Sequence, residues 1–243
     1  MIDLDPTDRI TVAGLPGTGK TTLTRYLADM FSSMEGTSLL IYDPLSQYVG
    51  FTPEEIYLPK SDSLAEFEGV CRRLCSVSNT MFVVEEAERY LGQDKRMGPY
   101  TFDFINRSRN WGCGIMAVTR RIQRLSKDFF DLCQHAFFFR CGLRSKDYIW
   151  DMIGREAALK VFSLPQYHFL YYSVETERYE VGTLVLSTRP HIDKEQEKVV
   201  VEERAVGKLK TEVGEERDAQ EKPGGRIQTQ KLAGTMFSKK EMK

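Results

Sequence analysis

A short segment near the N-terminus has the residue types and spacing of a phosphate-binding loop. Residues 14–21 read Gly-Leu-Pro-Gly-Thr-Gly-Lys-Thr, a glycine followed after four residues by Gly-Lys-Thr. Glycines let successive backbone N–H groups turn toward phosphate oxygens, Lys20 can reach the β- and γ-phosphates, and the Thr21 hydroxyl can ligate Mg²⁺. The pattern predicts nucleotide binding by Gly14, Pro16, Gly17, Thr18, Gly19, Lys20, Thr21 and Thr22. A dinucleotide-binding fingerprint is excluded, because Thr22 stands where that pattern needs glycine or alanine.

Two adjacent acids form a second candidate group. Residues 80–84 read Thr-Met-Phe-Val-Val, and Glu85 and Glu86 follow directly. An apolar strand that delivers acids at its carboxyl end is typical of a Walker B motif, because ligands of parallel α/β sheets lie beyond that end. Glu85 would support Mg²⁺, and Glu86 would orient and activate an attacking water. The alternative is that both acids only begin a helix over 87–91, where they would suit its dipole.

The elements around these residues predict an α/β fold with a mainly parallel central sheet flanked by helices. Residues 9–13 are predicted to form a strand and 22–31 a helix, which is the context that a phosphate loop requires. Near-continuous apolar runs, which suit strands buried on both faces, predict further strands at 38–43, 80–84, 115–118 and 136–139. We also expect a short strand at 55–58, helices at 64–77, 87–91, 102–110, 125–132, 146–153 and 156–162, and a hairpin from 169–174 and 178–184.

Composition narrows the class of protein further. A chain of 243 residues with 41% hydrophobic content fits one domain, 1–186, followed by a charged and largely disordered tail, 187–243. The net charge of −1 argues against coating nucleic acid by bulk positive charge, but it does not exclude a local basic patch. The five cysteines form no Cys-x-x-Cys pair and are predicted to be reduced. We see no signal-peptide pattern and no apolar run near the roughly 20 residues that span a bilayer.

The order of these motifs resembles the FtsK–HerA superfamily of DNA-pumping ATPases, and is most similar to the small genome-packaging ATPases of membrane-containing viruses. The more specific part is Arg-Asn-Trp-Gly at 109–112, Val-Thr-Arg-Arg at 118–121 and the strand that ends in Arg140. The resemblance implies a RecA-like ATPase that uses ATP and Mg²⁺ and translocates double-stranded DNA. It also implies a hexameric homo-oligomeric ring, a capsid or vertex protein as a further candidate partner, and a location in the host cytoplasm or the virion.

The resemblance also assigns expected roles to three arginines. The family usually has a γ-phosphate-sensing glutamine where this chain has Arg120, which could contact phosphate or point away. It also uses an arginine finger from a neighbouring subunit, for which Arg109 and Arg140 are the matching candidates. Either could instead pair with an acid in its own chain. Lys95 and Arg96 are candidate contacts to DNA phosphates, although their loop could be an ordinary connection.

Three other functions remain open from the sequence. A small-molecule kinase could use Arg120, Arg121 and Arg124 as a lid, but two consecutive acids fit water activation better than phosphate transfer to a metabolite. A non-hydrolysing assembly protein would bind ATP and recruit partners through its charged tail. A DNA-transfer or secretion ATPase would share the fold, although the lack of a predicted membrane segment counts against membrane-anchored members.

Overall fold

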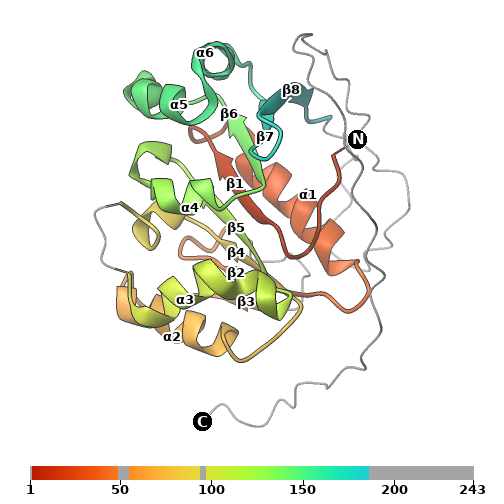
Figure 1. Cartoon of the computed structure of the whole chain (residues 1–243), viewed down its shortest axis with the longest axis vertical. Helices are drawn as coiled ribbons and strands as arrows, with labels where there is room; N and C mark the ends of the chain where they lie inside the picture. The colour runs from red at the N-terminus through yellow and green to blue at the C-terminus, as the bar shows by residue number, and fades with distance from the viewer. Residues whose placement is uncertain (1, 49–54, 94–96, 186–243) are drawn as a thin grey trace, which may run out of the picture. The chain divides into compact units, whose positions relative to one another are not determined.

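An eight-stranded sheet lies at the centre of this computed structural model, which describes residues 2–48, 55–93 and 97–185 (Figure 1). The strand order is β3-β2-β4-β5-β1-β6-β7-β8. In this order, each strand from β3 through β2, β4, β5 and β1 to β6 pairs in parallel with its neighbour. Strands β7 and β8 continue the sheet in antiparallel pairing. The bounds are β1 Arg9–Ala13, β2 Ser38–Tyr42, β3 Glu55–Tyr57, β4 Thr80–Val84, β5 Gly114–Thr119, β6 His135–Phe139, β7 His168–Ser173 and β8 Arg178–Thr183.

Helices cover both faces of the sheet, which explains the apolar runs in its central strands (Figure 1). Alternate residues point to opposite faces, so Ile10 and Val12 of β1 pack with Leu23 and Phe31 of α1, whereas Ala13 packs on the other side. The five remaining α-helices cover that second face. Their bounds, with α1, are α1 Lys20–Ser32, α2 Leu64–Leu74, α3 Pro99–Arg107, α4 Lys127–Asp131, α5 Lys146–Ile153 and α6 Arg155–Ser163.

All the predicted strands and the hairpin are present, but several helix bounds differ from the prediction. The helix expected over 102–110 begins at Pro99, because proline is tolerated in a first turn whose N–H groups lack helical partners. Residues 108–110 lie instead in a 3₁₀ turn, η2 (Ser108–Trp111). The helix expected over 64–77 ends at Leu74. These differences fall at helix ends, where periodicity carries the least information.

Two other predicted helices are shorter and irregular. The segment 87–91 forms only a single 3₁₀ turn, η1 (Ala87–Arg89), because Glu86 before it has a left-handed backbone. The helix expected over 125–132 begins only at Lys127, because Leu125 and Ser126 are extended, and it ends at Asp131. Leu125 and Ser126 separate η3 (Ile122–Arg124) from α4, and a further 3₁₀ turn, η4 (Leu143–Ser145), precedes α5.

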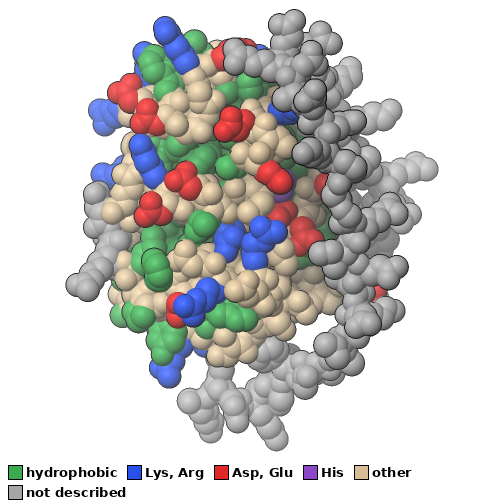
Figure 2. Space-filling model, viewed as in Figure 1, with side chains coloured by type: hydrophobic (Ala, Val, Ile, Leu, Met, Phe, Trp, Pro, Cys, Tyr) green, Lys and Arg blue, Asp and Glu red, His purple; other side chains and the backbone are tan. Residues whose placement is uncertain are grey.

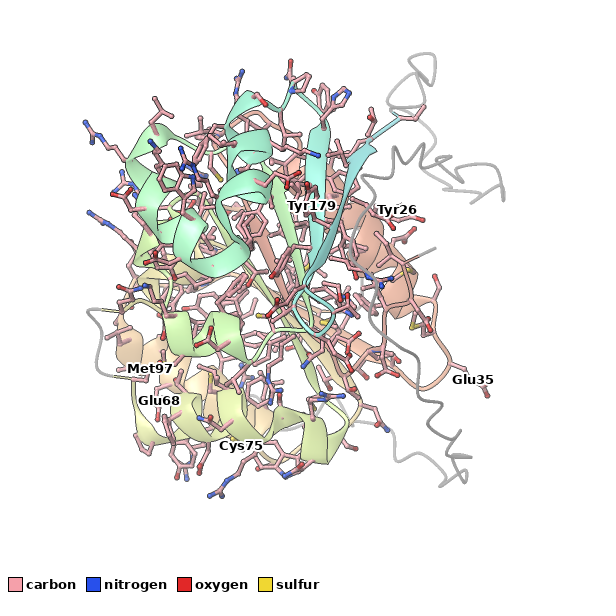
Figure 3. The ribbon with its side chains drawn as sticks, turned by 45° about the horizontal axis from the view of Figure 1, so that its top comes forward. Tyr26, Glu35, Glu68, Cys75, Met97 and Tyr179 are labelled. Carbon is pink, nitrogen blue, oxygen red and sulfur yellow. The ribbon has the colours of Figure 1, made fainter. Side chains whose placement is uncertain are left out.

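Side chains complete the ends of two helices on the second face. Ser63 caps α2 by accepting a hydrogen bond from the Glu66 N–H. Glu68, labelled on α2 in Figure 3, accepts hydrogen bonds from the N–H groups of Tyr100 and Thr101 at 2.7 and 3.0 Å. These N–H groups lie in the first turn of α3, where a carboxylate also complements the positive end of the helix dipole. The contact therefore joins α2 to the start of α3.

The surface shown in Figure 2 carries acidic and basic side chains among separate apolar ones. This mixture agrees with the net charge of −1. Among the described residues, we find no helix with the length and apolar character needed to cross a membrane. The predicted tail, 187–243, lies outside the described residues.

The core of the sheet supports a stability prediction. Phe138 in β6 is fully buried, so Phe138→Ala should lower the free energy of unfolding by about 3–5 kcal/mol, through lost apolar burial and a cavity. Phe102→Ala removes the same ring from a side chain that is 60% exposed, and it should change stability by no more than about 0.5 kcal/mol. Urea denaturation of both variants measures the difference. Equal losses would show that the second face is not packed as described.

Candidate functional site

The glycine-rich loop connects β1 to α1, as its motif predicts. Gly19 has φ +117°, and a Cβ there would lie 3.0 Å from ring atoms of Phe139 and Tyr167. At Gly14 a Cβ would lie 2.6 Å from the Cβ of Phe139. Side chains at these two positions would therefore clash with Phe139 at the end of the neighbouring strand β6, and at Gly19 also with Tyr167. These clashes explain the requirement for glycine. Pro16 lies at the exposed tip of the loop.

Neighbouring elements hold the loop in place through backbone hydrogen bonds. The Gly14 and Leu15 N–H groups donate to the carbonyls of Thr119 and Arg140, at 3.2 and 2.9 Å. On the opposite side, the Tyr167 N–H donates to the Thr18 carbonyl at 2.9 Å. The ends of β5 and β6 and the start of β7 thus fix the loop, which is preorganised for a ligand.

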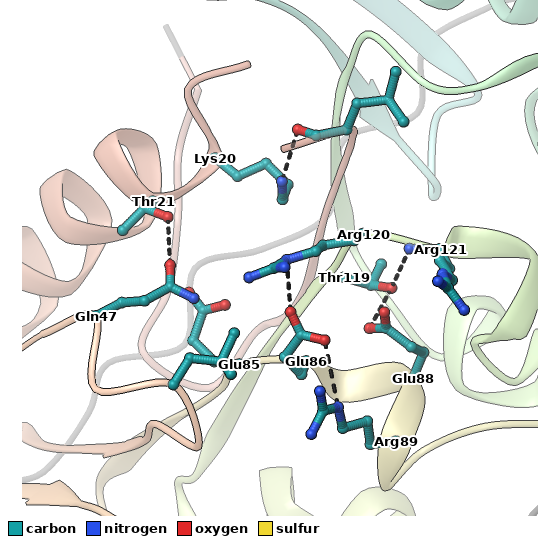
Figure 4. Close-up of polar contacts among 12 residues, drawn as sticks. Lys20, Thr21, Gln47, Glu85, Glu86, Glu88, Arg89, Thr119, Arg120 and Arg121 are labelled. Carbon is teal, nitrogen blue, oxygen red and sulfur yellow. Dashed lines mark hydrogen bonds and ion pairs between the residues drawn. The ribbon is translucent and has the colours of Figure 1, made fainter. Parts of the chain in front are cut away.

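The polar side chains of the loop are engaged by the protein itself (Figure 4). The Lys20 ammonium donates to the Leu15 carbonyl at 2.9 Å, and burial lowers the pKa of Lys20. The Thr18 hydroxyl also donates to this carbonyl, at 2.7 Å. The Thr21 hydroxyl donates to Gln47 Oε1 at 3.1 Å, while Thr22 is exposed on the first turn of α1. Lys20 therefore lies folded over the loop, where it can exchange a carbonyl for a phosphate oxygen.

Glu85 is buried at the end of β4 and has one close partner. The Tyr48 hydroxyl donates to Glu85 Oε1 at 2.5 Å, and Glu85 is only 4% exposed. Burial raises the pKa of Glu85 to about 7, and Asp43 nearby raises it further, whereas the Tyr48 hydrogen bond and Lys20 act in the opposite direction. Burial also raises the pKa of Tyr48, so its hydroxyl remains a donor. Glu85 is thus poised between its two protonation states near neutral pH.

Glu86 is held by two arginines, one on each carboxylate oxygen (Figure 4). Arg120 Nε lies 2.6 Å from Oε1, and Arg89 Nε lies 3.4 Å from Oε2. Arg89 also pairs with Asp62 at 2.7 Å. The backbone of Glu86 has φ +52°, a left-handed conformation that costs on the order of 1–3 kcal/mol in a residue with a side chain. The alternative in which both acids merely begin a solvated helix does not fit this buried and strained arrangement.

Several residues of the site carry no sequence motif. Gln47 and Tyr48 follow β2 in an irregular loop. They are recognised as part of the site only because Gln47 accepts a hydrogen bond from Thr21 and Tyr48 donates one to Glu85. Glu88 is buried and accepts a hydrogen bond from the Thr119 hydroxyl at 2.7 Å, which links η1 to the end of β5. Asp43 directly follows an apolar strand, as Glu85 does. Of these residues without a motif, Asp43 is the one that sequence analysis could have found, because an acid directly after a buried parallel strand lies at the ligand-binding edge of the sheet.

The three arginines that the resemblance singled out lie at two opposite edges of the sheet. Arg120 reaches Glu86, and exposed Arg140 follows β6 beside the loop. Arg109 lies instead at the opposite edge of the sheet, in a hollow of about 590 Å³ near the starts of β1 and β6 that Asp8 and Asp131 also line. Within one chain, Arg109 is therefore not part of the nucleotide site. Lys95 and Arg96 lie outside the described residues.

A parallel sheet with a phosphate loop after β1 and two buried acids after β4 defines a P-loop NTPase. Comparison with protein-family models finds no match, and comparison with curated protein sequences finds none either.

Known structures share the fold. The genome packaging NTPase B204 from Sulfolobus turreted icosahedral virus 2, in complex with ATP-gammaS, matches with a TM-score of 0.67 and 20% identity, over 75% of this chain and 100% of that one. The DNA-packaging ATPase B204 from Sulfolobus turreted icosahedral virus matches with a TM-score of 0.65 and 20% identity, over 73% and 98%. VirB4 of Thermoanaerobacter pseudethanolicus matches with a TM-score of 0.59 and 10% identity, over 77% and 92%. These likenesses confirm the predicted fold, a P-loop NTPase with a mainly parallel central sheet flanked by helices.

The position of Lys20 predicts its contribution to nucleotide affinity. Lys20→Ala removes charge-assisted hydrogen bonds of about 1.5–3 kcal/mol to the phosphates, so the affinity for an ATP analogue should fall at least about tenfold. Lys60→Ala removes an exposed lysine outside the loop and serves as the control. Isothermal titration calorimetry compares the two variants. Unchanged affinity in Lys20→Ala would place the nucleotide elsewhere.

Proposed function

We propose that this chain is a Mg²⁺-dependent ATPase that translocates double-stranded DNA during genome packaging, and that it works as a homo-oligomeric, hexameric ring. The observation that carries the proposal is the meeting, at one sheet edge, of the phosphate loop with the buried acids Glu85 and Glu86. This pairing suits attack of water on a γ-phosphate. The fold of B204, a genome packaging NTPase solved in complex with ATP-gammaS, supports the choice of substrate and task.

The donor set at this edge fits Mg²⁺. The ion prefers oxygen ligands, and the Thr21 hydroxyl and the Glu85 carboxylate supply oxygens from the two sides of the site. A carboxyl whose pKa lies at about 7 would ionise readily beside a divalent cation, because an opposite charge favours the ionised form. When bound, Mg²⁺ would neutralise charge on the β- and γ-phosphates, while Lys20 stabilises charge that develops during attack.

Glu86 is the residue to orient and activate water in this proposal. Both of its oxygens now face arginines, so a water that donates to Glu86 would share these oxygens with Arg120 and Arg89 or replace one of them. The γ-phosphate would compete with Glu86 for Arg120, since guanidinium binds phosphate strongly. ATP binding would thus free the catalytic acid and bring Arg120 to the phosphate in a single movement. Arg120 would take the place of the sensor glutamine of the resembling family.

The location of Arg109 suits action on a neighbouring subunit. In its own chain it lies at the edge of the sheet opposite the phosphate loop. A ring whose subunits pack head to tail would place one chain's Arg109 edge against the next chain's nucleotide, as an arginine finger requires. Arg140 lies beside its own phosphate loop and is the weaker candidate for that role.

The proposal and its rivals predict different rates of ATP hydrolysis with and without long duplex DNA. We expect DNA to stimulate hydrolysis, and the stimulation to weaken with salt, because phosphate contacts release counterions. Glu86→Gln should lower the rate by about 10²–10⁴-fold, and Glu35→Gln, an exposed control, should not change it. A kinase would ignore DNA and need a metabolite acceptor. An assembly protein would bind ATP with negligible turnover in either condition.

The environment of Glu85 predicts the pH dependence of hydrolysis. The acid must be ionised to act with Mg²⁺, and the cation itself favours the ionised form, so activity should rise with pH over a range at or below about 7, the pKa of Glu85 without the metal. The Tyr48 hydrogen bond lowers this pKa, so Tyr48→Phe should move the acid limb of the profile upward by roughly one unit. Tyr26→Phe alters an exposed tyrosine of α1 and should leave the profile in place. Superimposable profiles for all three proteins would rule out this role of Tyr48.

A further inference from the structure

The turns η3 and η4 lie side by side, just beyond the ends of β5 and β6. The Ser145 hydroxyl donates to Gln123 Oε1 at 2.7 Å, which joins the two turns directly. The Tyr148 hydroxyl of α5 donates to the Leu125 carbonyl, also at 2.7 Å. The two turns therefore form one rigid surface rather than two independent loops.

Three exposed arginines, Arg121, Arg124 and Arg144, stand on this surface, and we call them the arginine ridge. Within the described part of the chain, none of the three side chains forms an ion pair or a hydrogen bond. Their charges thus serve no contact that stabilises the fold. In a chain with a net charge of −1, such a group is a local concentration of positive charge that invites an anionic partner.

Two lysines near the ridge already have partners, whereas the exposed acids Asp128 and Asp147 form no ion pair among the described residues. Lys127 pairs with Asp151 at 3.2 Å, and the Lys146 ammonium lies 4.2 Å from the centre of the Trp150 ring. Asp147 is the exposed acid nearest the ridge in sequence, and it forms no ion pair with Arg144 among the described residues. Figure 2 shows lysine and arginine side chains along the upper left edge, where α5 lies in Figure 1, with acidic side chains between them. In the ridge, by contrast, no described acid pairs with any of the three arginines.

We infer that the arginine ridge binds the phosphate backbone of duplex DNA, an inference that rests on the proposed function. Guanidinium groups match phosphate oxygens in two parallel hydrogen bonds and stay charged at any physiological pH. Contacts to phosphates carry no sequence information, as a packaging motor requires. Because the two turns are joined, binding would order the arginine side chains without also having to order the turns that carry them.

The ridge is directly connected to the catalytic acid. Arg121 follows Arg120, whose side chain holds Glu86, and the Arg121 N–H donates to Thr119 Oγ1 at 3.1 Å. The hydroxyl of Thr119 in turn donates to Glu88. A DNA phosphate that binds the Arg121 side chain would therefore pull on the same short segment that positions Arg120. This link gives DNA a physical route to the rate of hydrolysis.

The test compares the full-length protein with a variant that carries Arg121→Ala, Arg124→Ala and Arg144→Ala. Fluorescence anisotropy with a labelled mixed-sequence duplex, in the presence of a non-hydrolysable ATP analogue, gives affinity as a function of salt. Losing three phosphate contacts should reduce the slope of log affinity against log salt by about 2–3 and lower the affinity at least about tenfold. Stimulation of hydrolysis by DNA should fall in parallel, while the rate without DNA should stay unchanged.

The control variant removes the same charge elsewhere, through Arg72→Ala, Arg107→Ala and Arg178→Ala, and it should bind DNA with nearly the original salt slope. Unchanged affinity and slope in the ridge variant would overturn the inference and leave the proposed function standing. A loss of hydrolysis without DNA, at full DNA affinity, would also overturn it by assigning these arginines to a nucleotide site. If the unaltered protein binds no duplex, both the inference and the proposed function are wrong.

Discussion

The burial of two carboxylates side by side after β4 is the constraint on which the site depends. An unpaired carboxylate taken out of water is costly, so each acid must find a partner. Glu85 obtains the Tyr48 hydroxyl and a raised pKa, whereas the Glu86 carboxylate lies between Arg120 and Arg89. The two acids thus differ in environment, and the difference suits the separate roles that we propose for them.

The parallel strand order brings these partners together from distant parts of the sequence. Because β5 lies between β4 and β1, the segments that follow all three strands share one edge. The phosphate loop follows β1, the acids follow β4, and Arg120 follows β5. The same geometry places Arg109, which precedes β5, at the far edge. Antiparallel pairing of these strands would have scattered the group.

Much of the fold and the centre of the site follow from the sequence, since buried strands leave apolar runs and the phosphate loop has a fixed spacing. The strand order does not, because no local pattern records which strands are neighbours. The segment 87–91 shows why a helix can be predicted wrongly. Glu86 has a left-handed backbone, which no sequence pattern indicates, and only a 3₁₀ turn follows it. Tyr48 was beyond sequence reasoning for another reason. A buried tyrosine in a loop looks like any core residue until its hydroxyl is seen on Glu85.

The C-terminal hairpin also has a mechanical consequence for the molecule. A Cβ at Gly19 would lie 3.3 Å from Leu184, and the Leu184 N–H donates to the carbonyl of Tyr167, whose own N–H holds Thr18. The described chain ends one residue later, at Val185. The end of the hairpin therefore supports one side of the phosphate loop, through Leu184 beside Gly19 and through Tyr167, which binds both Leu184 and Thr18. Displacing the end of β8 would thus loosen the loop on that side while leaving its contacts to β5 and β6 in place.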